Sequence, residues 1–224
     1  KQWLFVRVET DSGIVGWGES YTQSDRDGAI VAHLAQMRRY LIGRDPAAIK
    51  HFTTVMYLDW AGKRGAMEFY CAVSGIEQAL WDIVGKAAGQ PVYNLLGGAC
   101  RGRIRVYANG WGEGARTPES LAEAARGGVA RGFTALKFDP FPGPWREWIE
   151  RADEREAVAR VRAVREAIGP EVDLLIEVHR RLAPHAAIRM AGQLAEFAPF
   201  WYEEPVSSRQ LDELALVRRR IELP

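Results

Sequence analysis

The 224-residue sequence predicts an α+β region followed by an α/β region built on a parallel sheet. Two short alternating segments on either side of a turn, followed by helical patterns, indicate the first region. In the second region strand and helix patterns alternate four times, which favours a parallel sheet with helical crossovers. The charged fraction of 26% and the apolar fraction of 47% are typical of a folded chain rather than a disordered one.

The charge balance and the cysteines limit the partners and the compartment. Lys and Arg number 30 and Asp and Glu 29, so the net charge of +1 gives no reason to expect nucleic acid as a partner. No uninterrupted apolar stretch is long enough to cross a membrane, and the first residues alternate like a strand rather than a signal peptide. We therefore expect a cytoplasmic protein in which Cys71 and Cys100 are free thiols.

The first region begins with a predicted hairpin. Residues 4–9 and 14–19 are its strands, and Ser12-Gly13 forms the turn between them. Helical patterns follow, and Gly89-Gln90-Pro91 ends the longest of them. The helices are expected over residues 27–41, 46–58 and 68–88.

From about Arg103 the pattern becomes a regular alternation of strands and helices. Gly132 and Gly169-Pro170 are the stop signals of two of the helices. The strands are expected over residues 104–108, 134–138, 174–178 and 200–203. The helices are expected over residues 118–132, 147–168, 184–197 and 208–220.

Three of these strands end in polar residues that are costly to bury. Period-two alternation places Lys137 and Asp139 on one face of the second strand, and Glu177 and His179 on one face of the third. Glu203 ends the fourth strand. Because ligands of parallel α/β folds bind at the carboxyl ends of the strands, we expect these side chains to converge. Carboxylates on neighbouring strands are oxygen ligands suited to Mg²⁺.

Each polar strand end has a simpler explanation when it is taken alone. Lys137 could be an exposed strand end, His179 the start of a loop, and Glu203-Glu204-Pro205 a solvated turn. The coincidence of all three after consecutive strands favours a functional site. Lys137 is one of only five lysines in an arginine-rich chain, and beside carboxylates it would add positive charge or take part in acid–base chemistry.

Several segments share their order and spacing with a known family. They are Gly16-Trp17-Gly18-Glu19, residues 75–83, Gly85-Lys86, residues 91–98 and the polar strand ends. Through them the chain resembles the enolase superfamily, in its mandelate racemase-like branch. The resemblance implies a split α+β capping domain over residues 1–100 and a (β/α) TIM-like barrel over residues 101–224, of which only about the first half is present.

The resemblance also implies a chemistry. Such enzymes use Mg²⁺ to bind a substrate carboxylate and to stabilise the enediolate formed when a base removes the α proton. Glu177 and Glu203 match the first two metal ligands, and Lys137 matches the lysine of the second barrel strand. Asp139 stands where a racemase has a second base, whereas His179 looks like the general acid of the family's sugar-acid dehydratases.

The resemblance therefore favours a Mg²⁺-dependent dehydratase that removes the C2 proton of an aldonate or aldarate and eliminates the 3-hydroxyl. The alternatives are a racemase, epimerase or cycloisomerase of the same superfamily, and a non-catalytic chain that keeps the fold. The dehydratases often read His-Gly-Arg, but here Arg180 replaces the glycine. A sugar acid is the expected partner and a homo-oligomer the expected assembly. The residues expected to bind substrate are Tyr21, Trp60, Asp139 and Arg181.

The spacing of the two predicted metal ligands bears on the length of the enzyme. Glu177 and Glu203 are 26 residues apart, which is one strand–helix unit (203 − 177). One further unit would place the third ligand just beyond Pro224. We therefore expect the sequence to be part of a longer enzyme whose third ligand and general base follow Pro224, and we expect this part alone to be inactive.

Overall fold

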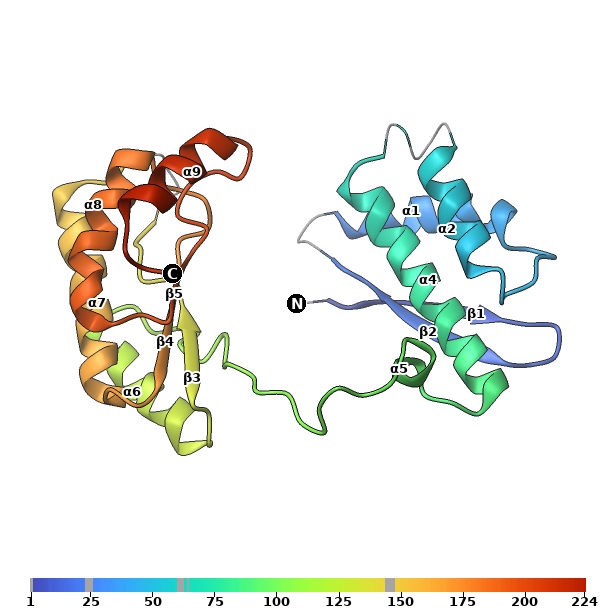
Figure 1. The fold of residues 1–224 in the computed structure, drawn as a ribbon, viewed down its shortest axis with the longest axis horizontal. Helices are drawn as coiled ribbons and strands as arrows, with labels where there is room; N and C mark the ends of the chain where they lie inside the picture. The colour runs from blue at the N-terminus through green and yellow to red at the C-terminus, as the bar shows by residue number, and fades with distance from the viewer. Residues whose placement is uncertain (1, 23–25, 60–62, 64, 144–147) are drawn as a thin grey trace. The chain divides into compact units, whose positions relative to one another are not determined.

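The computed structural model describes residues 2–22, 26–59, 63, 65–143 and 148–224 (Figure 1). The chain divides into two compact units, Lys1–Gly102 and Arg103–Pro224, which are called here the N-terminal and the C-terminal unit. Each has its own hydrophobic core. In the described part of the chain, no helix combines the length and the apolar character needed to cross a membrane.

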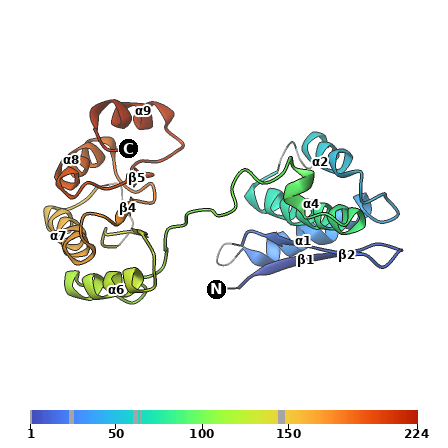
Figure 2. The same cartoon turned by 60° about the horizontal axis from the view of Figure 1, so that its bottom comes forward.

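The N-terminal unit is a β-hairpin covered on one face by helices (Figure 2). The hairpin is antiparallel, with Val6 opposite Gly18, and the long helix α4 lies along it while α1 and α2 pack on α4. The elements are β1 (Leu4–Glu9), β2 (Val15–Ser20), α1 (Asp27–Met37), η1 (Arg38–Tyr40), α2 (Ile49–Leu58), α4 (Met67–Ala88) and α5 (Val92–Leu95). The predicted hairpin and helices are thus confirmed, although the first helix gives way to a 3₁₀ turn at Arg38.

Glycines bring α4 into direct contact with the hairpin. A Cβ atom on Gly18 would lie 2.0 Å from the carbonyl oxygen of Gly75, and one on Gly16 would lie 2.1 Å from that of Ala79. A Cβ atom on Gly75 would in turn lie 2.3 Å from the Ser20 hydroxyl oxygen. The helix and strand backbones therefore pack without intervening side chains, which only glycine permits.

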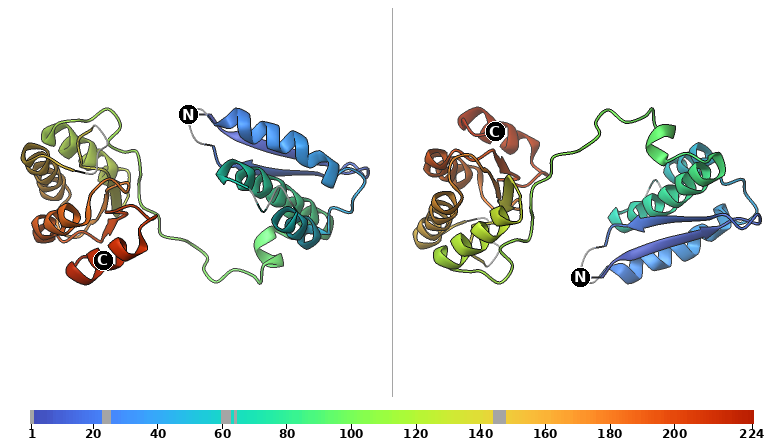
Figure 3. Two further views of the ribbon diagram at one scale, coloured as in Figure 1. Left: turned by 90° about the horizontal axis from the view of Figure 1, so that it is seen from above. Right: turned by 90° about the horizontal axis from the view of Figure 1, so that it is seen from below.

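The C-terminal unit is a parallel sheet of order β3-β4-β5 in which each strand is followed by a helix. Figure 3 shows the helices on the outside of this unit and the strands within. Its elements are α6 (Pro118–Ala130), β3 (Ala135–Phe138), α7 (Arg151–Ile168), β4 (Asp173–Glu177), α8 (Pro184–Leu194), η2 (Ala195–Phe197), β5 (Trp201–Glu203) and α9 (Leu211–Arg220).

Alternation along the strands separates an apolar face from a polar one. Leu136, Ile176 and Tyr202 are buried in the core beneath the helices, together with Val161 and Val164 of α7. The residues next to them along the strands point to the opposite face of the sheet. The predicted convergence of charged side chains therefore takes place on the face away from the helices.

One predicted strand is wrong. Residues 104–108 form no strand, and only Ala108 bridges to β3, through Leu136. Continued backwards, this parallel pairing would place Tyr107 opposite Ala135 of β3 and residues 104–106 opposite residues 132–134, which precede β3 and start in the turn at Gly132, where φ is 90°. Ile104 and Val106 are accordingly 80% and 59% exposed.

Candidate active site

A lysine bridges two carboxylates at the carboxyl end of the sheet. Lys137 Nζ lies 3.0 Å from Glu177 Oε2 and 2.9 Å from Glu203 Oε1. These residues come from β3, β4 and β5, and β4 lies between the other two strands, so the parallel register places Glu177 directly opposite Glu203. Lys137 and Glu177 are 8% and 4% exposed. The three side chains thus meet as the alternation predicted.

The bridge shifts the protonation equilibria of both partners. Burial favours the neutral carboxyl of Glu177, but hydrogen bonds from Lys137 Nζ and from the backbone N–H of His179 outweigh it and hold the pKa of Glu177 below its ordinary value. Burial likewise opposes the ammonium of Lys137, but its hydrogen bonds to Glu203 and Glu177 raise the pKa of Lys137 above its ordinary value. At neutral pH Lys137 is therefore an ammonium beside an ionised Glu177.

The donor set suits a divalent cation in part. Glu203 Oε2 is buried and has no hydrogen-bond partner, so one carboxylate oxygen of the pair is available for a ligand. Ionised carboxylate oxygens are the ligands that Mg²⁺ prefers. Within the described residues no group of three or more His, Cys, Asp or Glu side chains is arranged to hold a metal ion, so Glu177 and Glu203 would supply two ligands of a larger set.

His179 lies beside this bridge in a second polar cluster. Its Nδ1 atom is 3.0 Å from Asp139 Oδ2, and the same oxygen is contacted by the Arg181 guanidinium. Arg181 is only 9% exposed and also donates to the carbonyl oxygens of Val178 and Phe141. The structure therefore brings Asp139, His179 and Arg181 together, with the two residues expected to bind substrate in contact with each other.

The backbone after β4 has a left-handed conformation at two residues that are not glycine. The φ angles of His179 and Arg180 are 55° and 62°. Arg180 donates its backbone N–H to the carbonyl oxygen of Glu204 at 2.7 Å, and its guanidinium lies 3.1 Å from the Glu204 carboxylate. Such a conformation costs about 1–2 kcal/mol for each residue with a Cβ atom. The contacts with Glu204 offset part of this cost and fix the direction in which His179 leaves the strand.

The two remaining predicted substrate residues belong to the N-terminal unit. Tyr21 follows β2 and is 55% exposed. Trp60 lies outside the described residues. Their assignment to substrate binding stays a prediction.

Two aromatic residues near the bridge were not singled out in the sequence. Lys137 Nζ lies 5.5 Å from the ring centroid of Tyr107, close enough for a cation–π contact. Trp111 Nε1 donates to the carbonyl oxygen of Lys137 at 2.8 Å and so anchors the end of β3. In the sequence, both residues are marked only by being aromatic and by lying within three positions of Ala108, the residue that bridges to β3.

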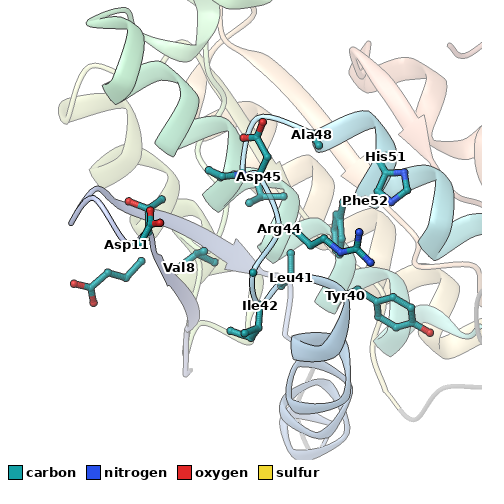
Figure 4. Close-up of a pocket in the computed structure, with 15 residues that line it drawn as sticks. Val8, Asp11, Tyr40, Leu41, Ile42, Arg44, Asp45, Ala48, His51 and Phe52 are labelled. Atoms are coloured by element: carbon teal, nitrogen blue, oxygen red, sulfur yellow. The ribbon is translucent and has the colours of Figure 1, made fainter.

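A cavity adjoins the bridge, and a separate one lies in the N-terminal unit. The first has a volume of about 430 Å³, and Lys137, Asp139 and Arg181 line it together with loop residues. The second, of about 550 Å³, is shown in Figure 4, with Arg44 and His51 on one side and Asp11 on the other. The charged residues of this second cavity are partly or fully exposed, whereas Lys137 and Arg181 of the first cavity are buried.

Comparisons with known proteins identify the family. Residues 1–97 match the N-terminal domain of the mandelate racemase / muconate lactonizing enzyme family, and residues 120–224 match the family described as enolase C-terminal domain-like. The chain belongs to the mandelate racemase-like branch of the enolase superfamily. The N-terminal unit is thus this family's capping domain, and the C-terminal unit is part of its barrel domain, as the resemblance implied.

Individual members of the superfamily agree with this assignment. The chain is 39% identical over 93% of its length to a D-gluconate dehydratase of Thermoproteus tenax and 38% identical over its whole length to a D-galactonate dehydratase of Verminephrobacter eiseniae. It spans 42% and 57% of these two relatives. The crystal structure of a member of the enolase superfamily from Salmonella Typhimurium is similar to this chain with a TM-score of 0.91 and 32% identity, covering 98% of this chain and 61% of that one.

Proposed function

We propose that the full-length protein is a Mg²⁺-dependent dehydratase of an aldonate or aldarate. The observation that carries the proposal is the pair of carboxylates, Glu177 and Glu203, bridged by Lys137 with His179 beside them. Two similar proteins are a D-gluconate and a D-galactonate dehydratase, which supports an aldonate of that type. The product would be a 2-keto-3-deoxy acid.

Each residue of the site has a role in this proposal. Glu177 and Glu203 would hold Mg²⁺, and the orphaned Oε2 of Glu203 is the oxygen most readily offered. When bound, the ion would supply the positive charge that stabilises the charge developing on the substrate carboxylate as the α proton leaves. Lys137 adds a second positive charge at the same place, because its ammonium lies between the two carboxylates.

His179 would supply the proton for the leaving group. Hydroxide is a poor leaving group, and a proton delivered to the 3-hydroxyl lets it depart as water. The Nδ1 atom of His179 lies 4.0 Å from Glu177 Oε1, so the ring is at the rim of the carboxylate pair. Its side chain is 43% exposed, which leaves it accessible to a substrate.

The proposal is tested on the full-length protein with a panel of aldonates and aldarates. The protein is treated with EDTA, and keto-acid formation and exchange of the C2 proton with solvent deuterium are followed before and after Mg²⁺ is added. We expect both to require Mg²⁺ for at least one substrate. Exchange with epimerisation and no keto acid would identify a racemase or epimerase instead, and no exchange with any sugar acid would contradict the proposal.

By the same family relationship we propose that the protein works in the cytoplasm as a homo-oligomer. Light scattering of the full-length protein tests the assembly. A monomer at micromolar concentration would contradict it.

A further inference from the structure

We infer that Asp139 is a positioning residue that fixes the tautomer of His179, so that the ring delivers its proton from Nε2. The inference rests on the proposed function, since it concerns how His179 would serve as the acid. It changes the role of Asp139 from a residue that binds substrate to one that acts through another side chain.

The contacts of the Asp139 carboxylate carry the argument. Oδ1 accepts the backbone N–H of Phe141 at 2.9 Å. Oδ2 contacts the Arg181 guanidinium and lies 3.0 Å from His179 Nδ1. Both oxygens are therefore engaged from fixed directions, one by the backbone two residues on and the other by side chains from the loop after β4.

Arg181 cannot turn away to release this carboxylate. Its Nε donates to the Val178 carbonyl oxygen at 2.9 Å and its Nη1 to the Phe141 carbonyl oxygen at 3.1 Å. The guanidinium is almost fully buried, so losing these partners would be costly. Asp139 thus stays beside His179 because the Phe141 N–H holds Oδ1 and the anchored Arg181 guanidinium holds Oδ2.

The chemistry of the partners decides which group donates. A guanidinium can only donate hydrogen bonds, and an ionised carboxylate can only accept them. An Asp139 that is paired with Arg181 is therefore the acceptor, and His179 donates from Nδ1. In the neutral ring this leaves the lone pair on Nε2, which is the tautomer that results when an imidazolium has given up its Nε2 proton.

The elimination step follows from this arrangement. After the base has taken the C2 proton, the electron pair left at C2 forms the C2–C3 double bond and the C3–O bond breaks. The oxygen keeps that bonding pair and takes the Nε2 proton of the His179 imidazolium, so that water leaves. The product ring is neutral with its proton on Nδ1, the form that Asp139 accepts.

The test reads the tautomer directly in the full-length protein. With the protein free of metal and labelled with ¹⁵N-histidine, NMR at a pH where the ring is neutral shows which nitrogen carries the proton, and His179→Gln identifies the signal. We expect the proton on Nδ1 in the wild type. In Asp139→Asn the amide N–H can donate to Nδ1, so we expect the proton to move to Nε2. A wild-type ring with its proton on Nε2 overturns the inference, whatever the variant does.

Kinetics of the same proteins give a second readout. Asp139→Asn should lower kcat for keto-acid formation by roughly a hundredfold or more, with a smaller change in KM, while exchange of the C2 proton continues. The matched control is Asp173→Asn, which removes a carboxylate from an aspartate–arginine pair at the opposite end of β4. It should change neither the tautomer nor kcat.

The failure of this inference and of the proposed function are distinguishable. If no sugar acid is dehydrated, the proposed function fails, yet the tautomer still shows whether Asp139 orients the ring. If dehydration occurs and Asp139→Asn keeps both the wild-type kcat and the Nδ1 proton, Asp139 has no positioning role.

Discussion

The two ends of the three-stranded sheet use the same kinds of charged residue in different ways. At the carboxyl end, Lys137 is buried between Glu177 and Glu203. At the amino end, the Arg105–Asp173 pair is 57% and 30% exposed. A second amino-end cation, Arg165, gives its guanidinium entirely to backbone oxygens. Its acceptors are the carbonyl groups of Phe197, Gly169, Val172 and Ala198.

This difference separates stability from function. Arg165 holds carbonyl oxygens that precede β4 and β5, so it joins elements of the fold and presents nothing to a ligand. At the carboxyl end a carboxylate oxygen of Glu203 remains buried without a partner, and the backbone at His179 is left-handed. A buried carboxylate oxygen without a partner is typical of a site that binds a ligand. Left-handed backbone alone is not the difference, because Ala198 at the amino end of β5 has a φ of 46°.

Replacing Lys137 with methionine should have the largest effect on stability. It leaves two largely buried carboxylates without their cation, and breaking a buried ion pair costs about 3–5 kcal/mol. Urea unfolding of the full-length protein in EDTA measures the loss. The control is Lys86→Met, which removes an exposed pair with Asp82 and should cost less than about 1 kcal/mol. Equal losses would mean that the buried Lys137 bridge contributes no more than an exposed ion pair.

Lys137→Met should also reverse the way in which the free energy of unfolding changes with pH: acid should destabilise the wild type but stabilise the variant. In the wild type the folded pKa of Glu177 lies below its ordinary value of 4.5, so the stabilisation is present at neutral pH and is lost as the pH falls through that folded pKa. Lys137 has a raised pKa, so its contribution is complete below 10.5 and is lost only as the pH rises through the folded value. Without Lys137, burial of Glu177 should raise the pKa of its carboxyl group. Protonation of Glu177 at acid pH then removes the unpaired negative charge and so stabilises the variant. The stability gap between wild type and Lys137→Met should therefore narrow from pH 7 to pH 4.5, and a constant gap would contradict the bridge.

Glu203→Gln should weaken Mg²⁺ binding. The substitution keeps the volume of the side chain but removes an ionised ligand, and even partners of metal ligands contribute about 10–100-fold to metal affinity. We expect the affinity of the full-length protein, measured by calorimetry, to fall by at least about a hundredfold. Unchanged affinity would show that Glu203 is not a ligand.

Arg180→Gly should stabilise the fold by a smaller amount. Glycine adopts the φ of 62° without the cost of about 1–2 kcal/mol that a Cβ atom brings. The ion pair that is lost with Glu204 is exposed on both sides and contributes little. A rise of a few degrees in the melting temperature is expected, whereas a fall would mean that the Glu204 contact outweighs the strain.

Asp173→Asn should have the smallest effect. Its pair with Arg105 is exposed, so its loss should change the free energy of unfolding by less than about 1 kcal/mol. Thermal unfolding at low and high salt measures it, because screening should weaken the wild-type pair and leave the variant unaffected. A loss well above about 1 kcal/mol, the upper end for exposed ion pairs, would mean that this end of the sheet also holds a buried electrostatic contribution.

The sequence predicted the site better where strands set the geometry than where loops did. Period-two alternation was enough to place Lys137, Glu177 and Glu203 on one face, because a parallel register fixes neighbouring strand ends. The pairing of Asp139 with His179 depends on the left-handed backbone that follows β4. No glycine marks that conformation, so the sequence alone did not indicate it.

The predicted strand over residues 104–108 failed for a related reason. Its alternation of Ile104 and Val106 is a genuine strand pattern, but a strand also needs an extended partner. For residues 104–106 that partner would be residues 132–134, which lead out of the turn at Gly132 before β3 begins. A strand forms only where an alternating sequence lies beside an extended segment with which it can pair. In this segment only Ala108 is paired.

The glycine contact between α4 and the hairpin has a consequence for how this unit can diverge. At Gly16, Gly18 and Gly75 a Cβ atom would lie within 2.3 Å of another atom, so every replacement requires a neighbouring atom to move. At a core position with a larger side chain, a smaller residue can be accepted when a neighbour becomes larger. Glycine has no side chain that could become smaller, so these three positions cannot change in this way. Sequence change in this unit is therefore expected in its loops and exposed faces rather than at these three glycines.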